Sequence, residues 1–128
     1  MRRINVVCAV IRDGDRIFAT ERGYGDYKDW WEFPGGKIEE GERPEEALAR
    51  EIREELATDI TVGDHIKTVD FAYPDFDLRL SSYWATVTDG NLTLLEHEAA
   101  KWLSFDEFDS VKWLPADKII VDFIRTTV

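Results

Sequence analysis

The sequence contains only one cysteine and far fewer basic than acidic residues. A single thiol, Cys8, excludes a disulfide within the chain, and its place in an apolar segment favours a packing role. The 16 Lys and Arg residues face 27 Asp and Glu residues, which gives a net charge of −11. Because proteins that bind a nucleic-acid backbone cluster Lys and Arg, we expect no nucleic acid polymer as a partner. A small anionic substrate is still compatible, since a metal and a few basic groups can invert the local field.

Long apolar runs and targeting segments are missing as well. No stretch approaches the ~20 apolar residues that cross a bilayer, and the residues after Met1 form a short strand-like run instead of a signal peptide. The chain has no internal repeat, low-complexity tract or linker. Its 128 residues, 44% of them hydrophobic, suffice for one domain with a core. We expect a single domain over residues 1–128, in the cytoplasm and away from membranes, as a monomer or homodimer.

The hydrophobic pattern predicts several strands. The first covers a continuous apolar run, which is typical of a strand buried on both faces. The segment Pro34-Gly35-Gly36 is expected to interrupt regular structure. Among the aromatic residues, Trp84 and Trp102 are expected in the core, because large aromatic side chains dominate burial. Strands are expected over residues 4–11, 16–20, 62–73, 78–87 and 100–103.

Two main helices complete the prediction. Pro44 suits the first turn of a helix that continues to Leu56, and Ser104 with Glu107 resembles a capping box that opens a short helix. Pro115 opens a final amphipathic helix. Strands mixed with two helices predict an α/β fold, an α/β/α sandwich with a mixed central sheet. The expected apolar face of the final helix consists of Ile119, Ile120, Phe123 and Ile124.

Three carboxylates are expected on one face of the first main helix. Glu51, Glu54 and Glu55 stand at spacings i, i+3 and i+4, which place them side by side. A cluster of this kind is often a solvated helix face with i,i+4 ion pairs. A divalent cation would also relieve the repulsion, and hard oxygen ligands suit Mg²⁺ or Mn²⁺.

The longer pattern around these carboxylates favours the metal. Gly36, Glu42 and the run from Arg50 to Glu55 stand at the spacings G-x5-E-x7-R-E-U-x-E-E, where U is a bulky aliphatic. The segment 36–58 thus resembles the Nudix box, and the whole chain is similar to the MutT-like branch of nucleoside triphosphate pyrophosphatases. At the end of the box, this chain has Ala57-Thr58 where the family has glycine and an aliphatic. Glycine there serves a left-handed helix end, so we expect this helix to end differently, with Ile60 as the apolar anchor.

The resemblance implies a reaction. Enzymes of this branch use Mg²⁺, with Mn²⁺ possible, to cut a nucleoside triphosphate between its α and β phosphates, which yields a monophosphate and pyrophosphate. A carboxylate positions the attacking water, and the sequence leaves open which one. The implied catalytic residues are Glu51, Glu54 and Glu96, and the implied metal ligands are the carbonyl of Gly35 with Glu51, Glu54, Glu55 and Glu96.

The resemblance also implies supporting residues. Arg22 and Lys37 match phosphate-binding positions of the branch. Gly36, Glu42 and Arg50 are structural residues of the box, and Arg50 is expected to pair with a box carboxylate such as Glu42. Glu98 is the fallback for Glu96, although either could belong to an acidic surface loop. Arg22 could equally be a solvated strand end.

The substrate base is implied by the residue that follows Pro115-Ala116. Asp117 stands where relatives that act on CTP-like substrates have aspartate, and an ionised carboxylate can accept from the cytosine amino group. Asp117 could instead be a first-turn carboxylate that complements the helix dipole. Phe33, Phe71 and Tyr73 are candidates to stack on the base. We therefore expect a CTP-like or modified pyrimidine nucleotide.

Three alternatives remain open at this point. The substrate could be 8-oxo-dGTP, as for MutT-type diphosphatases, or another nucleoside diphosphate derivative. The chain could also be a Nudix-fold ligand sensor without catalysis. Such sensors commonly lose box carboxylates, whereas this sequence retains them.

Overall fold

A central mixed sheet dominates the computed structural model, which describes residues 2–23, 25–94 and 99–127. The strand order is β3-β2-β1-β6-β5, with β4 paired to β1 and β7 paired to β2. The pairing of β1 with β6 is parallel, and the other pairings between these strands are antiparallel. The strands are β1 (Arg3–Asp13), β2 (Arg16–Glu21), β3 (Trp31–Glu32), β4 (Gly35–Lys37), β5 (Asp59–Tyr73), β6 (Phe76–Asp89) and β7 (Ala99–Ser104).

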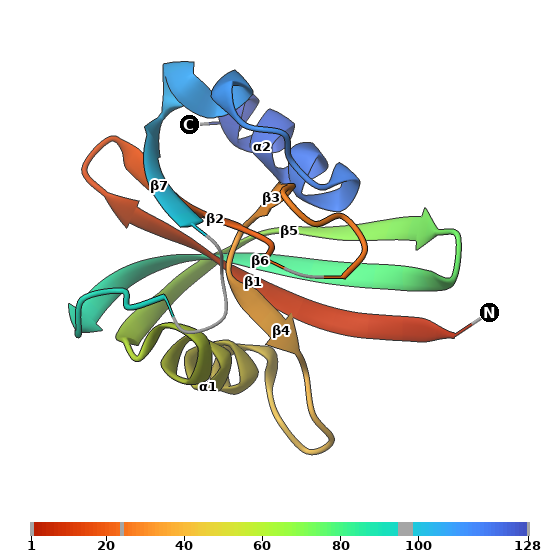
Figure 1. The fold of residues 1–128 in the computed structure, drawn as a ribbon. Coiled ribbons are helices and arrows are strands. Elements are labelled where there is room, and N and C mark those ends of the chain that lie inside the picture. The colour runs from red at the N-terminus through yellow and green to blue at the C-terminus, as the bar shows by residue number, and fades with distance from the viewer. Residues whose placement is uncertain (1, 24, 95–98, 128) are drawn as a thin grey trace.

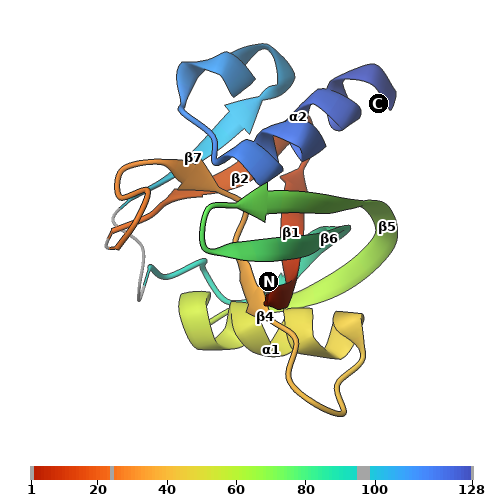
Figure 2. The ribbon, with the colours of Figure 1, turned by 90° about the vertical axis from the view of Figure 1, so that its right-hand side faces the viewer.

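Helices cover both faces of the sheet. Figures 1 and 2 show α1 (Pro44–Leu56) on one side and α2 (Pro115–Thr127) on the other, with a 3₁₀ helix, η1 (Phe105–Ser110), after β7. The predicted α/β/α sandwich with a mixed central sheet is confirmed. None of the helices in the described ranges is long and apolar enough to cross a membrane.

Strand β1 runs through the middle of the core. Residues Val7 to Ile11 are all buried, as the apolar run predicts. Because successive side chains of a strand point to opposite faces, Cys8 and Val10 join the core beneath α2, while Val7 and Ala9 join the core beneath α1. The packing role predicted for Cys8 is thus confirmed.

The glycine segment before α1 is a strand and not a break. Gly35 to Lys37 form β4, which pairs antiparallel with Val6 to Cys8 of β1. A β-carbon at Gly35 would clash with the carbonyl oxygen of Val7, so only glycine allows this close approach. The predicted interruption is present at Pro34, a bend between β3 and β4, and it was wrong at Gly35 and Gly36, because their strand depends on a partner distant in sequence.

Helix α1 begins at Pro44 as predicted, and its end differs from our expectation. Ala57 adopts the left-handed conformation that glycine usually supplies, with φ 50° and ψ 41°, and donates its N–H to the carbonyl of Arg53. Thr58 is buried, and its hydroxyl donates to the carbonyl of Leu56 and accepts from the N–H of Leu92, both at 2.8 Å. The usual helix end is therefore kept, and Ile60 packs half-buried against the same core.

Two details of core packing also differ. Trp84 and Trp102 are only half-buried, whereas Trp31 and Trp113 are the buried tryptophans among the described residues. The buried face of α2 is rotated from the predicted one: Ile119 is exposed and Phe123 is half-buried. The buried residues of α2 are Ala116, Asp117, Ile120, Val121 and Ile124.

The predicted capping box is present, since Glu107 accepts from the N–H of Ser104 at 2.9 Å.

Candidate active site

Arg50 of α1 is the centre of a dense ion-pair network. Its Nε and Nη2 donate to the two oxygens of Glu42 at 2.7 and 2.9 Å, so the expected pair exists and is bidentate. Nη1 donates to Glu51 at 3.0 Å and to Glu54 at 3.1 Å, while Nη2 also donates to the carbonyl of Lys37. The hydrogen bonds from Arg50, followed by that from the backbone N–H of Glu39, lower the pKa of the Glu42 carboxyl to about 2. Arg50 thus ties the loop before α1 to the carboxylate face of the helix.

Gly36 of β4 makes room for Glu51. A β-carbon at residue 36 would overlap the carboxylate of Glu51, whose side chain is only 15% exposed. Strand β4 and helix α1 therefore meet at this residue pair. The glycine of the box therefore has a steric role, because it leaves space for the carboxylate of Glu51.

The predicted metal ligands are only partly brought together. Glu51 and Glu54 meet at Arg50, and Glu55 lies half-buried on the same helix. Within the described ranges, no three His, Cys, Asp or Glu side chains converge closely enough to hold an ion as they stand. The carboxylate oxygens of these residues are still the donor type that suits a hard divalent cation. Glu96 and its fallback Glu98 lie outside the described residues.

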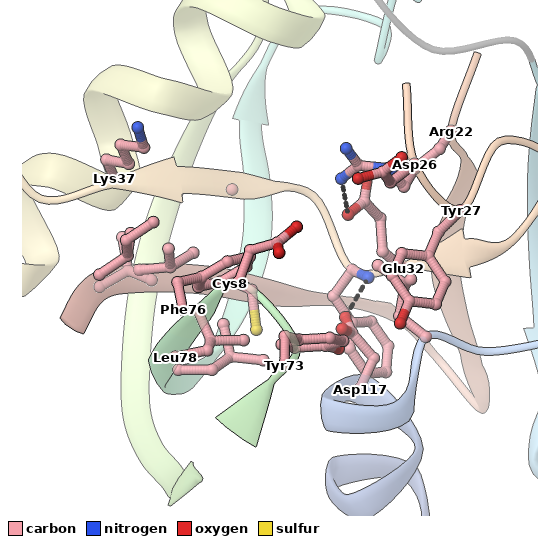
Figure 3. Close-up of a pocket in the computed structure, with 18 of the residues that line it drawn as sticks. Cys8, Arg22, Asp26, Tyr27, Glu32, Lys37, Tyr73, Phe76, Leu78 and Asp117 are labelled. Atoms are coloured by element: carbon pink, nitrogen blue, oxygen red, sulfur yellow. Dashed lines mark hydrogen bonds and ion pairs between the residues drawn. The ribbon is translucent and has the colours of Figure 1, made fainter. Parts of the chain in front are cut away.

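A cavity of about 680 Å³ opens beside β4 (Figure 3). Arg22 lies on one side of it and Lys37 on the other, so the two predicted phosphate-binding residues share one cavity. Phe71 is not among the described residues that line the cavity, and its ring instead packs against Tyr73 at 4.7 Å. The apolar wall consists of Ile4, Val6, Phe76, Leu78, Leu80 and Leu114.

Asp117 faces this cavity from the first turn of α2. It is 5% exposed, and its Oδ2 accepts from the N–H of Phe33 at 2.9 Å. Burial, followed by the negative charge of Glu32, raises the pKa of the Asp117 carboxyl to about 8. Asp117 does lie in the first turn of α2, as the alternative of a carboxylate that complements the helix dipole requires, and it is buried at the cavity instead of exposed to solvent.

Tyr73 and Phe33 also line the cavity. The hydroxyl of Tyr73 accepts from the N–H of Ala116 at 3.2 Å, and its ring stacks on Phe76 with centroids 5.4 Å apart. Phe33 is buried with its ring 4.8 Å from that of Trp113. Tyr73 thereby helps to fix the start of α2, and Phe33 holds Asp117 through its backbone.

Glu32 is a cavity residue that the sequence analysis missed. It lies on β3, its pKa is raised by burial, and Nη1 of Arg22 lies 3.3 Å from its Oε1. Nε of Arg22 is buried without a hydrogen-bond partner among the described residues. The available signal was a single ionisable residue inside the apolar segment from Trp30 to Pro34.

The chain resembles proteins of known activity along most of its length. The family model for the NUDIX domain matches residues 1–124. The CTP pyrophosphohydrolase of Escherichia coli strain K12 is 36% identical over 118 residues, which are 91% of this chain and 87% of that protein. The 8-oxo-dGTP diphosphatase of Proteus vulgaris is 35% identical over 94 residues, 72% of this chain and 84% of that protein.

A solved structure supports the same relationship. The solution structure of the E. coli ORF135 protein superposes with a TM-score of 0.85 at 32% identity, and the match covers 98% of this chain and 91% of that one. The shared fold therefore extends over nearly the whole chain.

Proposed function

Because this chain belongs to the Nudix family, we propose that it is a metal-dependent enzyme that hydrolyses a nucleoside triphosphate to a monophosphate and pyrophosphate. The observation that carries this proposal is the position of one cavity between Arg22 and Lys37. Gly35 and Lys37 of β4 line it, and Gly36 between them contacts the carboxylate of Glu51 on α1. Two relatives are named for the hydrolysis of nucleoside triphosphates, which supports the same reaction class.

The metal would be Mg²⁺, with Mn²⁺ as the alternative. Its ligands would be the carbonyl of Gly35, the carboxylates of Glu51, Glu54 and Glu55, and Glu96 from outside the described residues. The ion would draw charge from the phosphates. Arg50 already holds Glu51 and Glu54 on one face of α1, so these two oxygen donors are positioned by the fold.

The remaining side chains would bind the phosphates and orient water. Lys37 is exposed beside the cavity, and the unsatisfied Nε–H of Arg22 is a ready donor to a phosphate oxygen. Glu51, Glu54 or Glu96 would hold the attacking water and accept its proton.

The base would enter the apolar part of the cavity. Asp117 is buried there beside Tyr73 and the backbone of Phe33, which places a polar group that can form a hydrogen bond with the base next to apolar walls. We infer a cytosine-type nucleotide, because aspartate at this position and the relation to a CTP pyrophosphohydrolase agree. An 8-oxo-dGTP-type purine is the second candidate, supported by the relation to 8-oxo-dGTP diphosphatases.

Pyrophosphate release across a panel of canonical and oxidised nucleoside triphosphates tests this function. With Mg²⁺, the wild type should release pyrophosphate, and Glu55→Gln should abolish the release. Glu45→Gln is the matched control, because Glu45 lies exposed on the first turn of the same helix. Inactivity on every nucleotide, or full activity of Glu55→Gln, would contradict the proposal.

A further inference from the structure

The chain after β6 returns to the end of α1 and is fixed there (Figure 1). The hydroxyl of Thr58 accepts from the N–H of Leu92 at 2.8 Å, and the carbonyl of Leu56 accepts from the N–H of Thr93 at 2.9 Å. Thr58 also donates its hydroxyl to that same carbonyl at 2.8 Å. One buried side chain therefore joins the end of α1 to a residue 34 positions later in the chain.

The backbone of residues 90–94 is shaped for this contact. Gly90 has φ 101°, and a β-carbon there would lie 2.9 Å from the carbonyl oxygen of Ala57. Leu92 has φ 52°, a left-handed conformation that costs free energy for a residue with a β-carbon, and its side chain packs half-buried against the core beneath α1. Such a conformation persists only where surrounding contacts hold it, and the hydroxyl of Thr58 supplies one of these contacts.

Glu96, which is proposed as a metal ligand, comes in the sequence between two fixed parts of the chain. Before it comes the segment that is bound to Leu56, the residue directly after Glu55 of α1. After it, β7 begins at Ala99 and pairs with β2, which ends directly before Arg22. The anchor at α1 therefore fixes the described chain that leads into the stretch with this carboxylate.

We propose that Thr58 is a positioning residue for catalysis, because its buried hydroxyl fixes residues 90–94, the chain that leads to Glu96, against the end of α1. This inference rests on the proposed function. The groups that bind a metal depend on the packing and hydrogen bonds that hold them from behind. Thr58 stands where the Nudix box usually has an aliphatic residue, which has no hydroxyl to accept from Leu92. The anchor is thus a feature of this chain that the box pattern does not require.

Amide hydrogen exchange of the metal-free protein tests the anchor itself. The N–H of Leu92 should be protected in the wild type, and its protection should fall about tenfold in Thr58→Val, which keeps the shape of the side chain and loses the hydroxyl. The fall at Leu92 should exceed that at Ala9, whose N–H donates to the carbonyl of Pro34 at 2.8 Å in the core. An equal fall at both amides would overturn the proposal. Unprotected Leu92 in the wild type would overturn it without any variant.

Steady-state kinetics of pyrophosphate release test the role in catalysis. Thr58→Val should lower kcat about tenfold and leave KM for the nucleotide unchanged, because loss of a supporting contact typically costs about 10–100-fold in activity. Thr58→Ser should restore most of the rate, since serine keeps the hydroxyl. Thr88→Val is the matched control, because it removes an exposed hydroxyl that donates to the carbonyl of Asp59 at 3.0 Å. Wild-type kcat in Thr58→Val would contradict the proposal.

A double-mutant cycle separates positioning from a purely structural role. The pair Glu96→Gln and Glu98→Gln removes both carboxylates that follow the anchored segment in the sequence. In this background Thr58→Val should have no further effect on kcat, because the group that Thr58 positions is already absent. A further fall in kcat as large as in the wild-type background would show that Thr58 acts only on the fold, and would overturn the inference.

The outcomes distinguish this inference from the proposed function. A wild type that hydrolyses nucleoside triphosphates, combined with full activity of Thr58→Val, would refute the positioning role and leave the proposed function intact. A wild type that releases no pyrophosphate from any nucleotide would refute the proposed function, and this inference with it, whatever the exchange rate of Leu92.

Discussion

The carboxylate of Glu51 lies directly against the backbone of Gly36, with no space for a β-carbon between them. This contact joins β4 to α1 at the point where a metal ligand is proposed. The glycine is therefore required by the side chain that it faces and not by a turn, since residue 36 lies inside a strand.

Substitution of Gly36 by alanine should displace Glu51 and reduce kcat about 100-fold, as expected when a catalytic group moves by about 1 Å. Steady-state kinetics of pyrophosphate release provide the measurement. Gly63→Ala is the matched control, because a β-carbon there would meet its nearest neighbour at 3.3 Å. Equal kcat values for Gly36→Ala and the wild type would contradict the steric role.

The ion pair between Glu42 and Arg50 should make stability depend on pH. The pKa of Glu42 is lowered to about 2 from an ordinary value of 4.5, so its stabilising effect is complete above pH 5 and is lost as the pH falls toward 2. The difference in melting temperature between the wild type and Glu42→Gln should therefore be largest above pH 5 and should close toward pH 2. A difference that stays constant over this range would argue against the pair.

The left-handed end of α1 predicts a stabilising substitution. Ala57 has φ 50°, a conformation that glycine adopts without steric cost, so Ala57→Gly should raise the free energy of unfolding by about 0.5–1 kcal/mol. Urea denaturation measures the change. Ala49→Gly, in the interior of the same helix, should instead destabilise by about 1 kcal/mol. If both variants lose stability equally, the strain assigned to Ala57 is absent.

Periodicity and spacing predicted the parts of the molecule that local sequence determines. The apolar run of β1 and the Pro44 start of α1 follow from short-range patterns, whereas the pairing of Arg50 with Glu42 was implied by the resemblance to the Nudix box. The strand at Gly35 could not be predicted, because its formation depends on the approach of β1.

The cavity residues show a second limit. A hydrophobic pattern counts Asp117 as polar, so the predicted buried face of α2 was rotated from the observed one, although Ile120 and Ile124 belong to both. Glu32 pairs with Arg22 and lines the same cavity as Asp117 of α2, and no local pattern reveals these relations between distant segments. The role of Glu96 stays a prediction, because that residue lies outside the described part of the chain.

Identification of the products tests the central claim most directly. Phosphorus-31 NMR of the Mg²⁺-loaded wild type acting on its preferred nucleoside triphosphate should show the nucleoside monophosphate and pyrophosphate appearing in equal amounts. A nucleoside diphosphate with orthophosphate would contradict cleavage between the α and β phosphates.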